Sequence, residues 1–143
     1  MRELQTRPIP IPTEITQPYW DGAKKHQLMI QRCQRCKTYY HLPVASCAKC
    51  AGNEEASLCF EPVSGKGSVF TNTLVRDTRM KGFANIMPYP VVLVELAEQP
   101  RLIHYANMPT TKLEDIRIGR PVEVMFIEIG EGFTLPDFQL VND

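Results

Sequence analysis

The chain has 143 residues, of which 43% are hydrophobic and 22% are charged. These values are typical of one ordinary globular domain or of two small ones, and they exclude a disordered tail. The 16 basic and 16 acidic residues give a formal net charge of zero, so the chain lacks the strong positive charge typical of nucleic-acid-binding domains.

The sequence shows no targeting or membrane segment. The N-terminal residues contain no apolar stretch like that of a secretory signal, and no apolar run approaches the roughly 18 to 20 residues that a membrane span needs. We therefore predict a cytoplasmic protein without a membrane partner. Disulfides are rare in the cytoplasm, so the five cysteines are interpreted first as metal ligands.

Charge is distributed unevenly along the chain. Residues 1–52 hold eight Lys/Arg and three Asp/Glu, whereas residues 95–143 hold four Lys/Arg and nine Asp/Glu. A basic surface of this kind attracts phosphates or an acidic partner. The alternative is that two solvated faces of opposite charge complement each other, and the sequence leaves both interpretations open.

Residues 1–27 are predicted to form an extended arm followed by a docking helix. Three prolines alternate with isoleucine over residues 8–12, and proline favours extended backbone at its own position and at the one before it. A short helix is predicted from Gln17 to Gln27, because Pro18 suits a first helical turn. A helix this short is stable only when it packs against the rest of the chain.

Residues 28–56 are predicted to form a zinc ribbon. The spacing is Cys33-x2-Cys36, ten residues, then Cys47-x2-Cys50. Each C-x2-C turn lets both sulfurs point at one centre, and two such turns complete a tetrahedral site of four sulfurs. Such a site suits zinc or iron, and because it has no open position, zinc in it is structural and not catalytic. The alternative is a hairpin that has lost its metal but kept its shape.

The fifth cysteine and the three histidines fall outside this pattern. Cys59 lies in a predicted strand and is interpreted as a small buried hydrophobic residue. His26, His41 and His104 are scattered over a predicted helix, the ribbon and a strand. His41 lies near the predicted metal site in sequence, but four cysteines already complete that site. The histidines are therefore assigned no role.

Residues 57–143 are predicted to form an OB-fold, a small and partly open β-barrel. The order from Gly67 onwards is strand, strand, strand, short helix, strand, strand, with glycines at 65 and 67 where a barrel bends sharply. A β-sandwich fragment would give a similar pattern. The predicted strands are Leu58–Val63, Gly67–Arg76, Val91–Leu96, Arg101–Asn107, Val122–Ile129 and Phe133–Val141, and a helical turn capped by Thr111 is predicted over Thr111–Ile116. The whole chain is thus predicted to be mainly β with one short N-terminal helix.

A long loop from Asp77 to Pro90 interrupts the predicted strands. It carries the apolar residues Phe83, Ile86 and Met87, and loops of this length in compact domains are often functional. Together with the proline-rich arm and the docking helix, the loop offers apolar surface to a partner.

The residues alone favour an interaction subunit over an enzyme. The sequence has no G-x-S-x-G, P-loop or dinucleotide motif, and the predicted metal site is closed. A nucleic-acid-binding protein is the alternative, because zinc ribbons and OB-folds both serve that role. Against it stands the neutral charge, and four phenylalanines that lie within apolar strand patterns are interpreted as core: Phe70, Phe126, Phe133 and Phe138.

Six segments resemble a known family in order and spacing. They are PYWDGAKKHQLMIQRCQRC, CAKC, EPVSGKGSVFTNTLV, PYPVVLVEL, IRIGRPVEVMF and FTLPDFQ. From about Pro18 onwards the chain resembles the zinc-ribbon plus OB-fold proteins called DUF35, which are associated with acyl-CoA metabolism. The resemblance implies a rubredoxin-like zinc ribbon with Cys33, Cys36, Cys47 and Cys50 as ligands, followed by an OB-fold barrel.

The resemblance also implies a function. DUF35 proteins form hetero-oligomers with thiolase-like enzymes, whose large subunit carries the catalytic residues, so the chain is expected to be a non-catalytic subunit that supports acyl-CoA binding and carbon–carbon cleavage or formation. One expected system is a β-oxidation-like thiolase of aromatic degradation, such as benzoylsuccinyl-CoA thiolase; sterol side-chain and acetoacetyl-CoA systems are alternatives. The candidates for binding a CoA ester are Lys24, Lys25, Phe83 and Met87, and the loop around Lys81 is expected to set partner choice.

Overall fold

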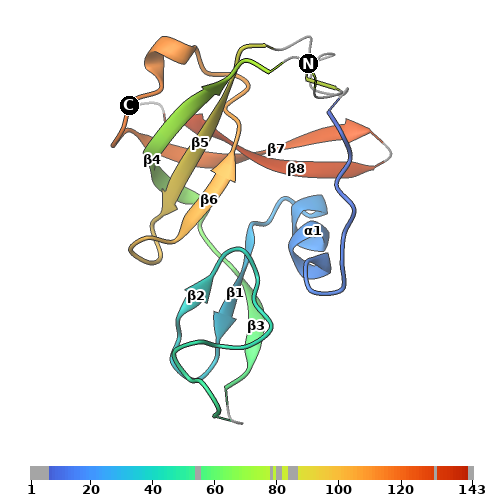
Figure 1. Cartoon of the computed structure of the whole chain (residues 1–143), viewed down its shortest axis with the longest axis vertical. Coiled ribbons are helices and arrows are strands. Elements are labelled where there is room, and N and C mark those ends of the chain that lie inside the picture. The colour runs from blue at the N-terminus through green and yellow to red at the C-terminus, as the bar shows by residue number, and fades with distance from the viewer. Residues whose placement is uncertain are drawn as a thin grey trace.

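The computed structural model describes residues 7–53, 56–77, 79, 82–83, 87–130 and 132–141. It consists of an N-terminal arm, one α-helix, a small three-stranded sheet and a five-stranded barrel (Figure 1). The arm runs past the barrel to helix α1 (Gln17–Lys24), which lies between the barrel and the small sheet. Within the described residues no helix has the length and apolar character to cross a membrane.

Helix α1 is shorter than the sequence predicts, since it ends at Lys24 and not at Gln27. The N–H groups of Lys25 and Gln27 both donate to the carbonyl of Gly22, and His26 between them has a φ of 58°. This left-handed residue stops the helix and turns the chain into the first strand.

The small sheet consists of β1 (Met29–Cys33), β2 (Tyr39–Tyr40) and β3 (Leu58–Pro62), in the order β2-β1-β3. Both pairs are antiparallel, and β3 pairs with β1 over its whole length, from Cys33 opposite Leu58 to Met29 opposite Pro62. Strand β3, which we grouped with the barrel in sequence, is therefore hydrogen-bonded to the ribbon.

The barrel sheet has the order β6-β5-β4-β7-β8, and all its pairs are antiparallel. Its strands are β4 (Lys66–Val75), β5 (Tyr89–Leu96), β6 (Ile103–Ala106), β7 (Pro121–Gly130) and β8 (Phe133–Leu140). A meander of three strands, one short helical turn and a hairpin make an OB-fold. The fold class predicted from sequence is confirmed, and the strand ends differ from the predicted ones by at most two residues.

The short turn between β6 and β7 is a 3-10 helix over Leu113–Asp115. It starts after Lys112, whose backbone is extended, and has no side-chain cap. Thr111 instead ends the preceding turn, where its N–H donates to the carbonyl of Met108. The predicted cap at Thr111 is therefore wrong, because the chain is still turning at that position.

Two glycines shape the entry to β4. Gly65 has a φ of 76°, in the left-handed region, and a Cβ atom there would collide with the side chain of Val124. At Gly67 a Cβ atom would collide with the carbonyl oxygen of Glu95 on the neighbouring strand. The predicted bend at the start of the first barrel strand thus depends on close backbone approach.

The core fills the barrel and continues under α1, with Phe138, Leu96 and Ile30 each at most 1% exposed. Phe70, which we predicted to lie in the core, is 41% exposed. Val69 points into the core and is 1% exposed, and successive side chains of a strand face opposite sides, so Phe70 points outwards. The strand also shifts register between Val69 and Thr71.

The barrel is sealed between β6 and β8 by side chains as well as backbone. The N–H of Phe138 donates to the carbonyl of Asn107, and the N–H of Asn107 donates to Oδ1 of Asp137, both at 3.1 Å. The guanidinium of Arg7, from the arm, lies 2.8 Å from Oδ2 of the same carboxylate. Arm and barrel therefore share a buried ion pair at this seam.

Candidate functional site

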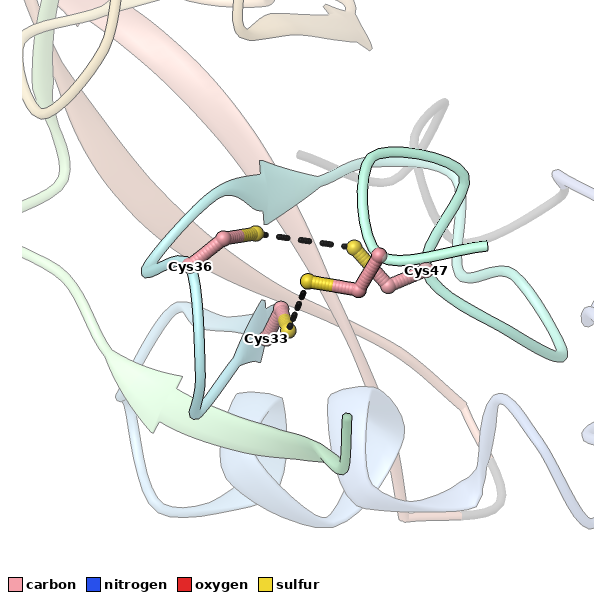
Figure 2. A group of neighbouring side chains, drawn as sticks. Cys33, Cys36 and Cys47 are labelled. Atoms are coloured by element: carbon pink, nitrogen blue, oxygen red, sulfur yellow. Dashed lines mark hydrogen bonds between the residues drawn. The ribbon is translucent and has the colours of Figure 1, made fainter. Parts of the chain in front are cut away.

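The four cysteines of the predicted ribbon lie together at the tip of the small sheet. Their sulfur atoms all lie within 4.8 Å of one another, with 3.5 Å between Cys36 and Cys47 and 4.0 Å between Cys33 and Cys50. Figure 2 shows three of these side chains converging from β1 and the two cysteine turns. A tetrahedral ion with Zn–S bonds of about 2.3 Å separates its sulfurs by roughly 3.8 Å, so the sulfur positions fit zinc.

Each cysteine pair is held by a tight turn. The N–H of Lys37 donates to the carbonyl of Cys33 at 2.9 Å, and Lys37 has a φ of 64°. In the second turn, the N–H of Asn53 donates to the carbonyl of Cys50 at 2.8 Å, after Gly52 with a φ of 77°. A left-handed residue just beyond each pair folds the chain back and leaves the two sulfurs on the same side.

Polar groups surround the sulfurs. The hydroxyl of Tyr40 lies 3.1 Å from Sγ of Cys47, and that of Thr38 lies 3.2 Å from Sγ of Cys36. The hydroxyl and backbone of Thr38 lower the pKa of Cys36 to about 6, and the Tyr40 hydroxyl lowers that of Cys47. These donors favour the thiolate form, which a metal ion requires.

The pKa of Cys50 is raised, whereas the pKa values of Cys36 and Cys47 are lowered. The guanidinium of Arg35, 3.7 Å from its sulfur, lowers the pKa of Cys50, but desolvation and the neighbouring cysteine sulfurs outweigh it and raise the pKa to about 11. A divalent ion overcomes this cost by its own charge. With all four sulfurs directed at one point, the centre is closed and suits structural zinc.

The histidines and the fifth cysteine lie elsewhere. His41 stacks against His104, with 4.7 Å between ring centres, and Nε2 of His104 lies 2.8 Å from the hydroxyl of Tyr19. This stack, formed by Tyr19, His41 and His104, joins the helix, the ribbon and the barrel. Cys59 is exposed on β3, so its predicted burial is wrong, because it occupies an outward-facing position of a sheet that is solvated on that side.

A side-chain amide makes a second junction between ribbon and barrel. Oε1 of Gln99 accepts a hydrogen bond from the N–H of Tyr39 at 2.9 Å, and its Nε2 donates to the carbonyl of Tyr39 at 3.1 Å. The amide thus pairs with β2 as a neighbouring strand would. Gln99 lies in the predicted turn between β5 and β6, and nothing in the sequence pattern indicated this role.

We expect the histidine stack to make stability depend on pH. Burial lowers the pKa of His41 to about 4 and that of His104 to about 3. Because the folded state keeps both rings neutral while the unfolded chain protonates them near their ordinary pKa, the free energy of unfolding falls as the pH drops below about 6.5, by about 2 kcal/mol per ring and about 4 kcal/mol in total near pH 5. Urea unfolding at several pH values measures this.

A substitution separates this effect from acid release of the metal. His41→Phe keeps a ring in the stack but removes one titrating group, so the fall in stability should be about half as steep. The matched control is His26→Gln, because His26 is exposed and stacks on Phe126 outside the histidine stack. Equal pH profiles for His41→Phe and the unmodified chain would contradict the prediction.

The four candidate residues for binding a CoA ester do not form one site. Lys24 ends α1, Lys25 follows it, and both are exposed. Phe83 stacks on Tyr89 with 4.8 Å between ring centres and lines a different cavity from Lys24, and Met87 is half-buried. Lys81 and Ile86 lie outside the described residues.

Two known domain families match this chain. Residues 20–55 match the model described as "ChsH2, rubredoxin-like zinc ribbon domain", and residues 60–126 match "ChsH2, C-terminal OB-fold domain". These two matches cover the end of α1, strands β1 and β2 with the cysteine turns, and the barrel from β4 into β7.

Three curated relatives are similar in sequence. The chain is 32% identical over 93% of its length to a "Probable enoyl-CoA hydratase alpha subunit" of Thermomonospora curvata. It is 29% identical over 84% of its length to a "DUF35 domain-containing scaffold protein" of Pyrococcus furiosus, and 27% identical over 85% to the "3-oxo-4,17-pregnadiene-20-carboxyl-CoA hydratase alpha subunit" of Mycobacterium tuberculosis. It spans 40% and 35% of the two hydratase subunits and 83% of the scaffold protein.

Two solved structures are similar in fold. The first is a chain of the "Ltp2-ChsH2(DUF35) aldolase", with a TM-score of 0.78 and 30% identity over 92% of this chain and 98% of that one. The second is a DUF35 protein of unknown function from Sulfolobus solfataricus, with a TM-score of 0.58, 10% identity and coverage of 90% and 86%; at that identity only the fold is shared.

Proposed function

Because the chain belongs to the DUF35 family of zinc-ribbon and OB-fold proteins, we propose that it is a non-catalytic subunit of an enzyme that acts on acyl-CoA thioesters. The observation that carries the proposal is the match, over nearly the whole of both chains, to the DUF35 chain of an aldolase complex. Two curated relatives are themselves named as alpha subunits of acyl-CoA hydratases. A partner subunit is thus the common feature of these relatives.

The chemistry of the described residues favours a subunit that does not itself carry out catalysis. The metal centre is closed by four sulfurs, so it offers no position for a substrate. The buried polar groups at the barrel seam bind one another: Arg7 pairs with Asp137, and Tyr19 pairs with His104. These two pairs hold the arm and the helix against the barrel. We therefore assign catalysis to the partner subunit.

The proposed partner is a thiolase-like large subunit that carries the catalytic residues. This chain would complete the complex and support binding of the CoA ester during carbon–carbon cleavage or formation. Within this class, the aromatic system named above, benzoylsuccinyl-CoA thiolase, stays a proposal, and a hydratase partner is the alternative suggested by the relatives' names.

Co-expression tests the proposal directly. The chain is expressed with candidate thiolase-like and hydratase-like subunits from its own genome, and the purified material is analysed by size-exclusion chromatography and mass spectrometry. We expect a stable hetero-oligomer that turns over an acyl-CoA, while the chain alone does not. Turnover by the chain alone, or failure to associate with either class of partner, would refute the proposal.

The exposed lysines at the end of α1 provide a prediction for this complex. If Lys24 and Lys25 attract the CoA phosphates, their joint replacement by alanine should raise KM for the acyl-CoA by about threefold to tenfold and leave kcat unchanged. The matched control is Lys112→Ala, because Lys112 is also exposed but lies beside the 3-10 helix between β6 and β7 and not on α1. An unchanged KM would remove both lysines from the binding site.

A further inference from the structure

An aromatic groove lies on the face of the barrel that carries ligands in other OB-folds. That face is formed by the second and third barrel strands with the loop before them, which here are β5, β6 and Phe83 from the preceding loop. The groove has a volume of about 310 Å³ and continues to β8, α1 and Arg7. This volume is at the lower end of the range for small-molecule sites.

The walls of the groove suit a flat ring. Phe83 and Tyr89 stack with 4.8 Å between ring centres, Tyr105 is 58% exposed, and Trp20 and Pro136 complete the lining. Aromatic faces and proline rings favour a planar partner that stacks against them. An exposed tyrosine on a four-residue strand contributes little to the core, so its ring is available to a ligand.

The charges in the groove exclude a polyanion. Arg7 is the only cationic residue among the described residues that line it, and its Nη2 is already 2.8 Å from Asp137. Both side chains are 5% exposed. A nucleic acid needs unpaired cations along such a groove, so the aromatic lining here does not indicate an oligonucleotide.

Arg7 also has a donor without an acceptor. Its Nε is buried and has no hydrogen-bond partner, while both oxygens of Asp137 are used, one by Arg7 and one by the N–H of Asn107. A buried donor left in this state is costly, and it is satisfied by an oxygen that comes within reach. Arg7 lines the groove, so an oxygen of a ligand in the groove lies next to the side chain that carries this donor.

We propose that this aromatic groove binds a flat aromatic ring that carries a carbonyl or carboxylate oxygen, with the ring against Tyr89 and Tyr105 and the oxygen accepting from Arg7. The site lies within this chain and needs no partner subunit. Its failure would therefore leave the proposed subunit role untouched, and failure of the subunit role would leave the groove untouched.

Titration of the full chain with 2-naphthoate tests the site. Trp20 is the only tryptophan and lines the groove, so its single indole N–H signal in a ¹⁵N-labelled sample reports binding. We expect a saturable shift with a Kd of about 0.1 to 1 mM, as suits a ligand of this size. Cyclohexanecarboxylate, which lacks the flat ring, and 2-naphthylmethylammonium, which lacks the oxygen, should bind at least about tenfold more weakly. Equal binding of all three compounds would overturn the proposal.

Two variants locate the binding. Tyr105→Ala removes an exposed wall of the groove and should weaken 2-naphthoate at least about threefold; Arg7→Lys keeps a cation opposite Asp137 but has no Nε–H, and should weaken it about fivefold or more. The matched control is Phe70→Ala, because Phe70 is also exposed but does not line the groove. If Arg7→Lys fails to fold, Tyr105→Ala decides alone, and unchanged affinity in that variant would overturn the proposal.

Discussion

Replacement of Cys33 by serine is expected to abolish stable metal binding and to unfold the ribbon. Cys33 is fully buried, and its sulfur lies 4.0 Å from that of Cys50. Zinc held by four thiolates supplies on the order of 10 kcal/mol to the folding of such a lobe. Loss of even a third of that amount should lower the melting temperature by about 10 °C in a chain of this size.

Elemental analysis and thermal unfolding measure the two effects together. The unmodified chain should carry one zinc ion per chain, and Cys33→Ser should carry little or none. The matched control is Cys59→Ser, because Cys59 is exposed on the neighbouring strand β3 and lies outside the sulfur cluster. Full zinc occupancy in Cys33→Ser, or an equal loss in Cys59→Ser, would contradict the assignment of the four ligands. Bound iron in place of zinc would correct the metal and leave the ligands in place.

Replacement of Asp137 by alanine is expected to destabilise the barrel by about 3 to 5 kcal/mol. The substitution leaves the guanidinium of Arg7 buried without its counter-ion, 2.8 Å from the lost oxygen. It also removes the acceptor for the N–H of Asn107 at the seam. Burial raises the pKa of Asp137 although Arg7 lowers it, so the pair itself adds little net stability and most of the expected loss comes from the stranded charge.

Urea unfolding of matched variants measures this loss. Asp77→Ala is the control, because the Asp77 and Arg79 side chains are paired at the surface, 47% and 89% exposed, and such a pair contributes less than about 1 kcal/mol. In the double variant Arg7→Met, Asp137→Ala, part of the lost stability should return, since no charge is left unpaired. A loss below about 1 kcal/mol in Asp137→Ala would show that the seam does not depend on the carboxylate.

Local chemistry explains which features could be predicted from sequence. The cysteine spacing fixes two turns that must face each other, and β5 is a short run of almost entirely apolar residues, several of them β-branched, which is typical of a strand, so ribbon and barrel could both be predicted. The outward position of Phe70 could not, because Val69 and Phe70 are both apolar and the sequence does not indicate which of the two faces the core.

The junctions between elements could not be predicted for a different reason. Arg7 and Asp137 are 130 positions apart in sequence, and Tyr19 and His104 are 85 apart. No periodicity relates such distant residues, and single arginine or histidine side chains in a sequence are most often solvated. A buried charge becomes informative only when its partner is known, which requires the fold.

The path of the chain limits how far the protein can be divided. Sequence suggests two modules in series, yet the chain runs from α1 through the ribbon strands into β4 (Figure 1), and both α1 and the arm seal the barrel from outside. A truncated fragment starting at β4 would lose Tyr19 and Arg7 and would leave the buried His104 and Asp137 without these partners. We therefore expect the zinc lobe and the barrel to unfold together as one cooperative unit.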